Sequence, residues 1–197
     1  MVSFKVIPKA ASPDLDGAIT YYTLGAIFVI PLLIGVFVVG TNAELTNQAN
    51  QVSHDLASMY AQGVDFSSAP NQKIAMRVAD GVGMKLEGGQ AVVILSKIRV
   101  VRDSDCGSSP SAKCSNRGYP VVLQRYVIGN TRLRGSSLGS PANIDPKTGD
   151  VGNWASDATA RADVFALGIK DAEYTYAAEC FLATPDVGTG VYSRAMF

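Results

Sequence analysis

The chain has 197 residues, of which 47% are hydrophobic and only 17% are charged, against roughly 25% charged residues in an average soluble domain. Its 17 basic and 17 acidic residues give a formal net charge of zero, which argues against a broad basic surface for nucleic acid. One histidine and three cysteines are too few for most zinc sites with several ligands. These counts exclude an ordinary soluble cytoplasmic enzyme, and we expect no nucleic-acid partner, no metal and no cofactor.

A charge-free apolar segment covers Ala18–Gly40. As a helix it would measure about 35 Å at about 1.5 Å per residue, enough to cross a bilayer core of about 30 Å. Pro31 lies in its middle, where a kink is tolerated because neighbouring groups in a membrane or bundle can satisfy the freed carbonyl. Lys5 and Lys9 precede the segment, and no Lys or Arg follows until Lys73. The positive-inside rule therefore keeps the N-terminus in the cytoplasm and exports the rest.

Three interpretations of this segment compete. A cleaved secretory signal is disfavoured because its apolar run is usually about 7–15 residues long and is followed by a small-residue cleavage site. A plain membrane anchor is the second interpretation. The third, which we favour, is an assembly helix that packs against copies of itself and so hides most of its apolar surface. The residues assigned to this contact are Ile27, Val29, Ile30, Pro31, Leu32, Leu33, Ile34, Val36, Phe37, Val38 and Val39.

The helical pattern continues beyond Gly40. Apolar residues recur at intervals of three and four from Leu45 to Met59, which predicts an amphipathic helix. Gly63 is a plausible stop, so the first helix is expected over Leu15–Gln62. Its first half is apolar all round and its second half has a single apolar stripe, as in a stalk that supports a head domain.

The rest of the chain predicts a small antiparallel β head of about four strands, so the fold class is α+β. A second helix is expected over Asn71–Met84. The expected domains are a short N-terminal segment (1–17), a stalk helix (18–63, with the membrane span at 18–40) and an exported head (64–197). Residues rich in β-branched and aromatic side chains predict strands at Ala91–Val101, Tyr119–Ile128, Glu173–Ala183 and Gly190–Phe197, with loop composition over Gly135–Asn153.

Two of the three cysteines, Cys106 and Cys114, flank a Gly/Ser/Pro-rich loop between the first two strands. Such a loop can bring two thiols to bonding distance, and the exported side is oxidising. We therefore favour a Cys106–Cys114 disulfide over two free surface thiols. Cys180, in an apolar strand, is expected to be a small buried residue, with an intersubunit bridge as the minority interpretation.

The candidate catalytic and calcium-binding motifs in this sequence lack elements that their chemistry requires. Residues 135–139 fit G-x-S-x-G around Ser137, but a nucleophile elbow needs a strand before it, a helix after it and a histidine downstream. The only histidine, His54, lies upstream on the stalk helix. The segment from Asp145 to Asp150 lacks the spacing of a calcium loop and is explained by a turn. We expect no enzyme.

Several segments resemble the TadE-like proteins of tight-adherence pili. These are the proline-centred run Phe28–Gly40 with the Asn/Ala-rich helix that follows (41–63), Leu123–Pro141, Tyr176–Gly188, and the ending from Tyr192. The resemblance implies a pilin-like subunit that is exported and built into or beneath an extracellular filament. One departure is that Tyr22 and Gly25 stand where pilin-type segments carry a glutamate, which leaves open a chain cut after Gly17 and an uncut one.

The leading hypothesis is therefore a structural subunit of a bacterial extracellular filament. Its partners would be copies of itself, the inner membrane before assembly, and the pilus assembly machinery. The alternative is a single-span, non-polymerising accessory protein of a pilus or secretion machine. A membrane-tethered hydrolase using Ser137 is a distant third.

Overall fold

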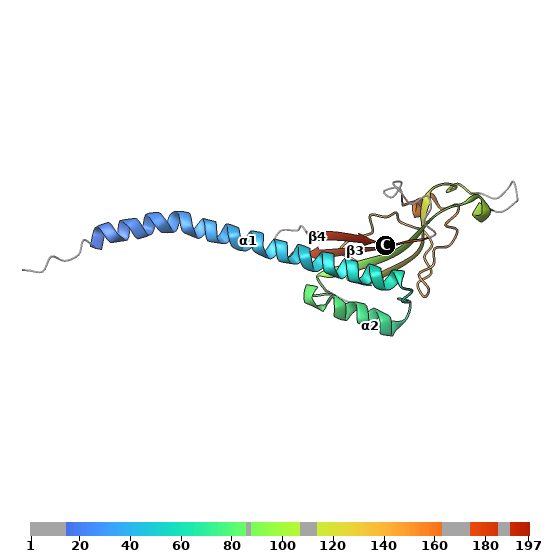
Figure 1. Cartoon of the computed structure of the whole chain (residues 1–197), viewed down its shortest axis with the longest axis horizontal. Coiled ribbons are helices and arrows are strands. Elements are labelled where there is room, and N and C mark those ends of the chain that lie inside the picture. Colours follow the sequence, from blue (N-terminus) through green and yellow to red (C-terminus); the bar gives the residue numbers. More distant parts are fainter. Residues whose placement is uncertain (1–14, 86–87, 107–113, 163–173, 185–189) are drawn as a thin grey trace, which may run out of the picture. The chain divides into compact units, whose positions relative to one another are not determined.

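The computed structural model of the protein describes residues 15–85, 88–106, 114–162, 174–184 and 190–197. By its internal contacts the chain forms two compact units, residues 1–42 and residues 43–197, and each is described by itself. The boundary falls inside the first helix, α1 (Leu15–Ala61) (Figure 1). Most of the expected N-terminal segment 1–17, and the first residue of the third expected strand, lie outside the described residues.

Helix α1 ends within one residue of its expected limit, for a local reason. Gly63 adopts a left-handed conformation with φ of 88°, which costs glycine little because it has no Cβ. Its N–H donates to the carbonyl of Tyr60 at 3.0 Å, and the N–H of Val64 donates to that of Met59 at 3.1 Å. These two bonds form a Schellman motif, which satisfies carbonyls that the last turn would leave unpaired.

The second helix differs from its expected limits. Helix α2 covers Ala69–Val78, so Pro70 lies in its first turn, where no intrahelical N–H is needed. The expected helix from Asn71 to Met84 was wrong at its C-terminal end, because a short 3₁₀ turn, η1 (Asp80–Val82), follows instead. Gly81 and Gly83 each weaken a helix by about 1 kcal/mol relative to alanine, and Gly83 closes the turn with φ of 67°.

The described residues form one antiparallel sheet of four strands, which confirms the expected α+β class. The strands are β1 (Ala91–Val100), β2 (Pro120–Gly129), β3 (Thr175–Ala183) and β4 (Gly190–Met196), in the spatial order β2-β1-β3-β4. The register between β1 and β2 shifts between Lys97 and Ile98. Because β1 is central, its first six residues are all buried, which explains their almost uninterrupted apolar sequence.

One face of the sheet packs against the C-terminal part of α1, which belongs to the same unit. Leu56, with no solvent exposure, lies in a cluster with Val93 and Leu95 of β1 and Cys180 of β3. The α1 residues buried in this cluster share the predicted apolar stripe, and they are Ala49, Val52, Leu56, Ala57 and Tyr60. The second half of the long helix is therefore part of the core of the head.

The opposite face of the sheet is covered by the connection between β2 and β3, whose described residues form no α-helix. Ile98, Val122 and Ala177 of the strands are buried against Leu138, Val151, Ala160 and Ala162. These last four residues come from the connection between β2 and β3, which includes the short 3₁₀ turn η3 (Ala158–Ala160). The predicted loop at 135–153 is thus a packed layer of the head.

Candidate functional site

The apolar half of α1 exposes its side chains all round within the first unit. Among the expected assembly residues, exposed fractions run from 49% at Val38 to 72% at Phe37, and Pro31 is exposed as well. Within Tyr22–Ala61 lies the only helix among the described residues that is long and apolar enough to cross a membrane, judged by length and composition. A continuous apolar surface of this kind requires a cover of lipid or protein.

Pro31 shapes this surface. The helix continues through it, although proline supplies no N–H to the carbonyl four residues before it. An open groove of about 480 Å³ lies at this level, lined by Thr23, Ala26, Ile27, Ile30 and Pro31. We call it the Pro31 groove.

A second feature of interest is a buried carboxylate on the sheet. Glu179 of β3 is 2% exposed and accepts hydrogen bonds from the hydroxyl of Ser136 and from the backbone N–H of Ser137 at 2.9 Å. The hydroxyls of Ser137 and Tyr192 also donate to it, each at 2.6 Å. Four hydrogen bonds therefore compensate for the water that this buried charge has lost.

Arg125 of β2 binds the loop at residues 136–139, the same loop that contacts Glu179 of β3. Its guanidinium donates to the carbonyls of Leu138 and Gly139, each at 2.8 Å, and to the hydroxyl of Ser96 at 3.1 Å. Burial lowers the pKa of Arg125 to about 10, and the negative charge of Glu179 opposes that shift. Arg125 and Glu179 together fix residues 136–139 on the sheet.

The pKa of Glu179 leads to a pH prediction. Burial raises this pKa, but the hydrogen bonds from Ser136, Ser137 and Tyr192 outweigh burial and hold it below its ordinary value. The folded state thus binds this proton more weakly than the unfolded chain, whose glutamate pKa is about 4.3. The stabilisation is complete above that pH and is lost as the pH falls through the folded pKa.

We therefore expect the urea midpoint of the head, followed by Trp154 fluorescence, to fall between pH 6 and pH 3. The fall should be smaller in the Glu179→Gln variant, which carries no carboxylate at this position, although that variant is less stable at pH 6. Tyr192→Phe, which removes one of the four donors, should lie between the two proteins. Equal pH dependence of Glu179→Gln and the unsubstituted chain would contradict this assignment.

The G-x-S-x-G segment lies within this cluster. The Ser137 hydroxyl contacts Glu179 and the hydroxyl of Tyr192, the latter at 2.9 Å, and no helix follows in the described chain until η3. His54 packs edge-on against Phe197, with ring centroids 4.9 Å apart. The hydroxyl of Ser137 is hydrogen-bonded to the Glu179 carboxylate, which holds the loop in place. The absence of catalysis stays a prediction.

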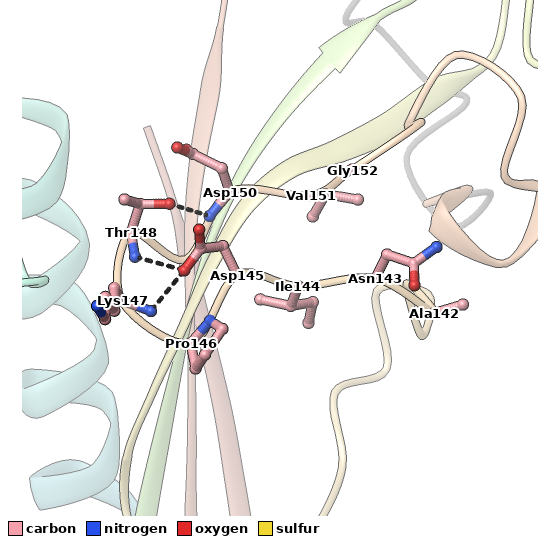
Figure 2. A pocket seen from close by; sticks show the side chains of 10 residues that line it. All are labelled: Ala142, Asn143, Ile144, Asp145, Pro146, Lys147, Thr148, Asp150, Val151 and Gly152. Carbon is pink, nitrogen blue, oxygen red and sulfur yellow. Dashed lines mark hydrogen bonds between the residues drawn. The ribbon is translucent and has the colours of Figure 1, made fainter.

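The aspartates on either side of residue 148, Asp145 and Asp150, accept hydrogen bonds from groups in and beside a turn. Figure 2 shows the side chain of Asp145 directed at the backbone of its own loop, where one carboxylate oxygen accepts from the N–H of Lys147 at 2.7 Å and of Thr148 at 3.4 Å. Asp150 accepts from the side-chain amide of Gln124 at 2.9 Å. The loop lines an open depression of about 850 Å³. In the described part of the chain, no three His, Cys, Asp or Glu residues are grouped so as to hold a metal.

Cys106 and Cys114 form a disulfide, with Cα atoms 5.5 Å apart. It ties the connection between β1 and β2, and a loop of this length contributes about 2–3 kcal/mol in the chain-entropy account. Residues 107–113, which form the tip of the predicted loop, lie outside the described residues. Cys180 is buried under α1, and burial raises the pKa of its thiol to about 12.

The Glu179 cluster was not identified from the sequence. The available signal was a single carboxylate inside the apolar stretch Tyr176–Ala183, because a charged residue within a buried strand is rare unless it is paired. Its partners come from residues 136, 137 and 192, and only the fold brings these positions together.

Comparisons with protein-family models, with curated proteins and with solved structures find no match to this chain. The resemblance to TadE-like proteins stays a prediction from the sequence. Two structural features remain as the basis for a function: the exposed apolar helix with its Pro31 groove, and the head fixed by the Glu179 cluster and the disulfide.

Proposed function

We propose that the protein is a structural subunit of a bacterial extracellular filament, held together by packing of its apolar helices. One observation carries the proposal. The helix from Tyr22 to Val39 is charge-free and exposed all round, and it continues into a helix that is built into the core of a folded head. A subunit of this kind joins its copies through the rod and presents the head outward.

The cysteine bridge supports export of the head. Disulfides persist in oxidising compartments and are rare in the cytosol, and Cys106 and Cys114 are joined in the head. The lysines before the apolar helix favour the same orientation. The chain would thus lie in the inner membrane before assembly, with its head outside, and enter a surface filament afterwards with the help of assembly machinery.

The free energy of assembly depends on whether the apolar helix is in water or in lipid before it joins other copies. Moving a large apolar side chain from water to a buried position stabilises by about 1.5–3 kcal/mol, so exposed copies in water would associate strongly. From lipid, that gain is absent, and close packing between helices must drive association. The shape of the rod surface then decides whether and how copies join.

The test is assembly of the full-length chain from detergent. On detergent removal we expect fibres of this single chain in negative-stain images, and filaments sheared from cells should contain the same protein. Discrete particles of constant size, together with its absence from sheared material, would refute the filament and support the single-span accessory protein. The intact mass of the filament subunit would show whether the chain is cut after Gly17.

A further inference from the structure

The groove and a bulky aromatic side chain lie on nearly opposite sides of the apolar helix. An α-helix turns about 100° per residue, which places the groove residues Thr23 to Pro31 around one direction and Phe28 about 130° from its centre. Phe28 is 72% exposed. It also lies at the same height along the helix as the groove, within about one residue.

Two glycines lie on the Phe28 side of the helix. Gly25 lies one turn before it and Gly35 two turns after it, and at either glycine nothing lies within 4 Å of the position that a Cβ would occupy. Leu24 and Leu32 lie one turn before and one turn after Phe28 on the same side and are 54% and 64% exposed, so Phe28, at 72%, is the most exposed large side chain of this row. The groove, at about 480 Å³, has room for a phenyl ring, since a closed cavity of about 150 Å³ accepts benzene.

We propose that Phe28 of one copy inserts into the Pro31 groove of the next copy, and that this contact sets the arrangement of helices in the filament. The inference rests on the proposed function and names the contact by which the subunits recognise each other. Because the ring and the groove lie on different sides of one helix, the contact is heterologous. Each copy uses its ring on one neighbour and its groove on another, and such contacts build rings or open helical assemblies rather than closed dimers.

A second copy of this chain fits the groove better than other occupants. The exposed large apolar side chains of residues 22–39 together exceed the roughly 800 Å² that one partner contributes to a standard interface. The segment carries no charge, so identical helices inserted in the same direction can approach without repulsion. Parallel copies also bring Phe28 to the height of the neighbouring groove with almost no axial shift.

The first test compares two phenylalanines on the same rod. Phe28 and Phe37 are equally exposed, at 72%, but Phe37 lies on the groove side of the helix. Phe28→Ala should lower the sedimentable fibre yield at least tenfold, whereas Phe37→Ala, which loses the same side chain, should lower it less than threefold. Equal yields from the two variants would overturn the inference.

A compensating pair separates this contact from a general loss of apolar surface. Ala26→Leu fills the groove and should also lower the fibre yield, because Phe28 no longer fits. In the double variant Ala26→Leu/Phe28→Ala, the larger groove residue meets the smaller partner, so the yield should exceed that of either single variant. A double variant that assembles no better than the worse single variant would count against the insertion.

Cross-linking tests the geometry with Phe28 left in place. Leu32 lies on the Phe28 side, one turn further along, and Ile30 lines the groove. The pair Leu32→Cys/Ile30→Cys should give a ladder of dimers, trimers and larger species on oxidation, while each single variant gives none. The matched pair Ile27→Cys/Ile34→Cys places both thiols on the groove side and should give no ladder.

The outcomes distinguish the two proposals. Unsubstituted chain that forms no fibres refutes the filament. Fibres that cross-link equally through both cysteine pairs, or that form cross-linked dimers through Leu32→Cys alone, leave the filament standing and refute the heterologous Phe28 contact.

Discussion

Replacing Val36 by aspartate is expected to abolish fibre formation by the full-length chain. Val36 is 63% exposed on the apolar rod, where the proposed filament would surround it with apolar side chains of other copies. A carboxylate buried there without a partner loses its hydration, which costs several kcal/mol. Val36 lies near the end of the expected span 18–40, so on insertion scales aspartate there costs less than the about 2.5–3.5 kcal/mol that it costs at the centre of a membrane helix. Sedimentation and negative-stain imaging after detergent removal provide the measurement.

Two controls separate burial of the charge from other effects. Val36→Ala shortens the same side chain without adding charge and should still give fibres. Asn47→Asp adds a carboxylate at an exposed position of the same helix inside the head unit and should assemble like the unsubstituted chain. If Val36→Asp formed fibres in normal yield, the apolar helix would not be the assembly surface.

The second large effect is expected in the head. Leu56 of α1 has no solvent exposure and contacts the sheet core, so Leu56→Ala leaves a cavity among side chains that can close it only in part. Such truncations cost about 2–5 kcal/mol of unfolding free energy. The measurement is urea unfolding of the full-length chain in detergent, followed by the fluorescence of Trp154, the only tryptophan, which packs within the head.

Leu33→Ala is the matched control, because it makes the same change on the same helix at a position that is 59% exposed and belongs to the other unit. In this control the head should unfold at the unsubstituted midpoint, within about 0.5 kcal/mol. If Leu56→Ala left the head as stable as it is in the unsubstituted chain, the C-terminal part of α1 would not contribute to its core.

The helix and the strands were predictable because their signals are local. The apolar run and the stripe from Leu45 to Met59 fixed α1, and Gly63 marked its end through the left-handed conformation of a helix cap. The β-branched stretches gave four strands within two residues of their observed limits. The C-terminal end of α2 was missed because the expected helix ran through Gly81 and Gly83, which do not sustain a helix.

Non-local features were beyond the sequence pattern. Nothing in the spacing of the strands gives the order β2-β1-β3-β4, which places β3 beside β1 across the long connection from residue 130 to residue 174. The Glu179 cluster depends on that order, since its donors come from the loop after β2 and from β4.

The continuity of α1 has a practical consequence for preparing a water-soluble fragment of the head. A fragment that starts after the helix, near Val64, would lack the five buried apolar side chains of α1 between Ala49 and Tyr60 and should aggregate through the uncovered sheet. A fragment that starts near Ala43 removes the lipid-seeking half and keeps the core intact. Expression trials and crystallisation should therefore begin from the second fragment.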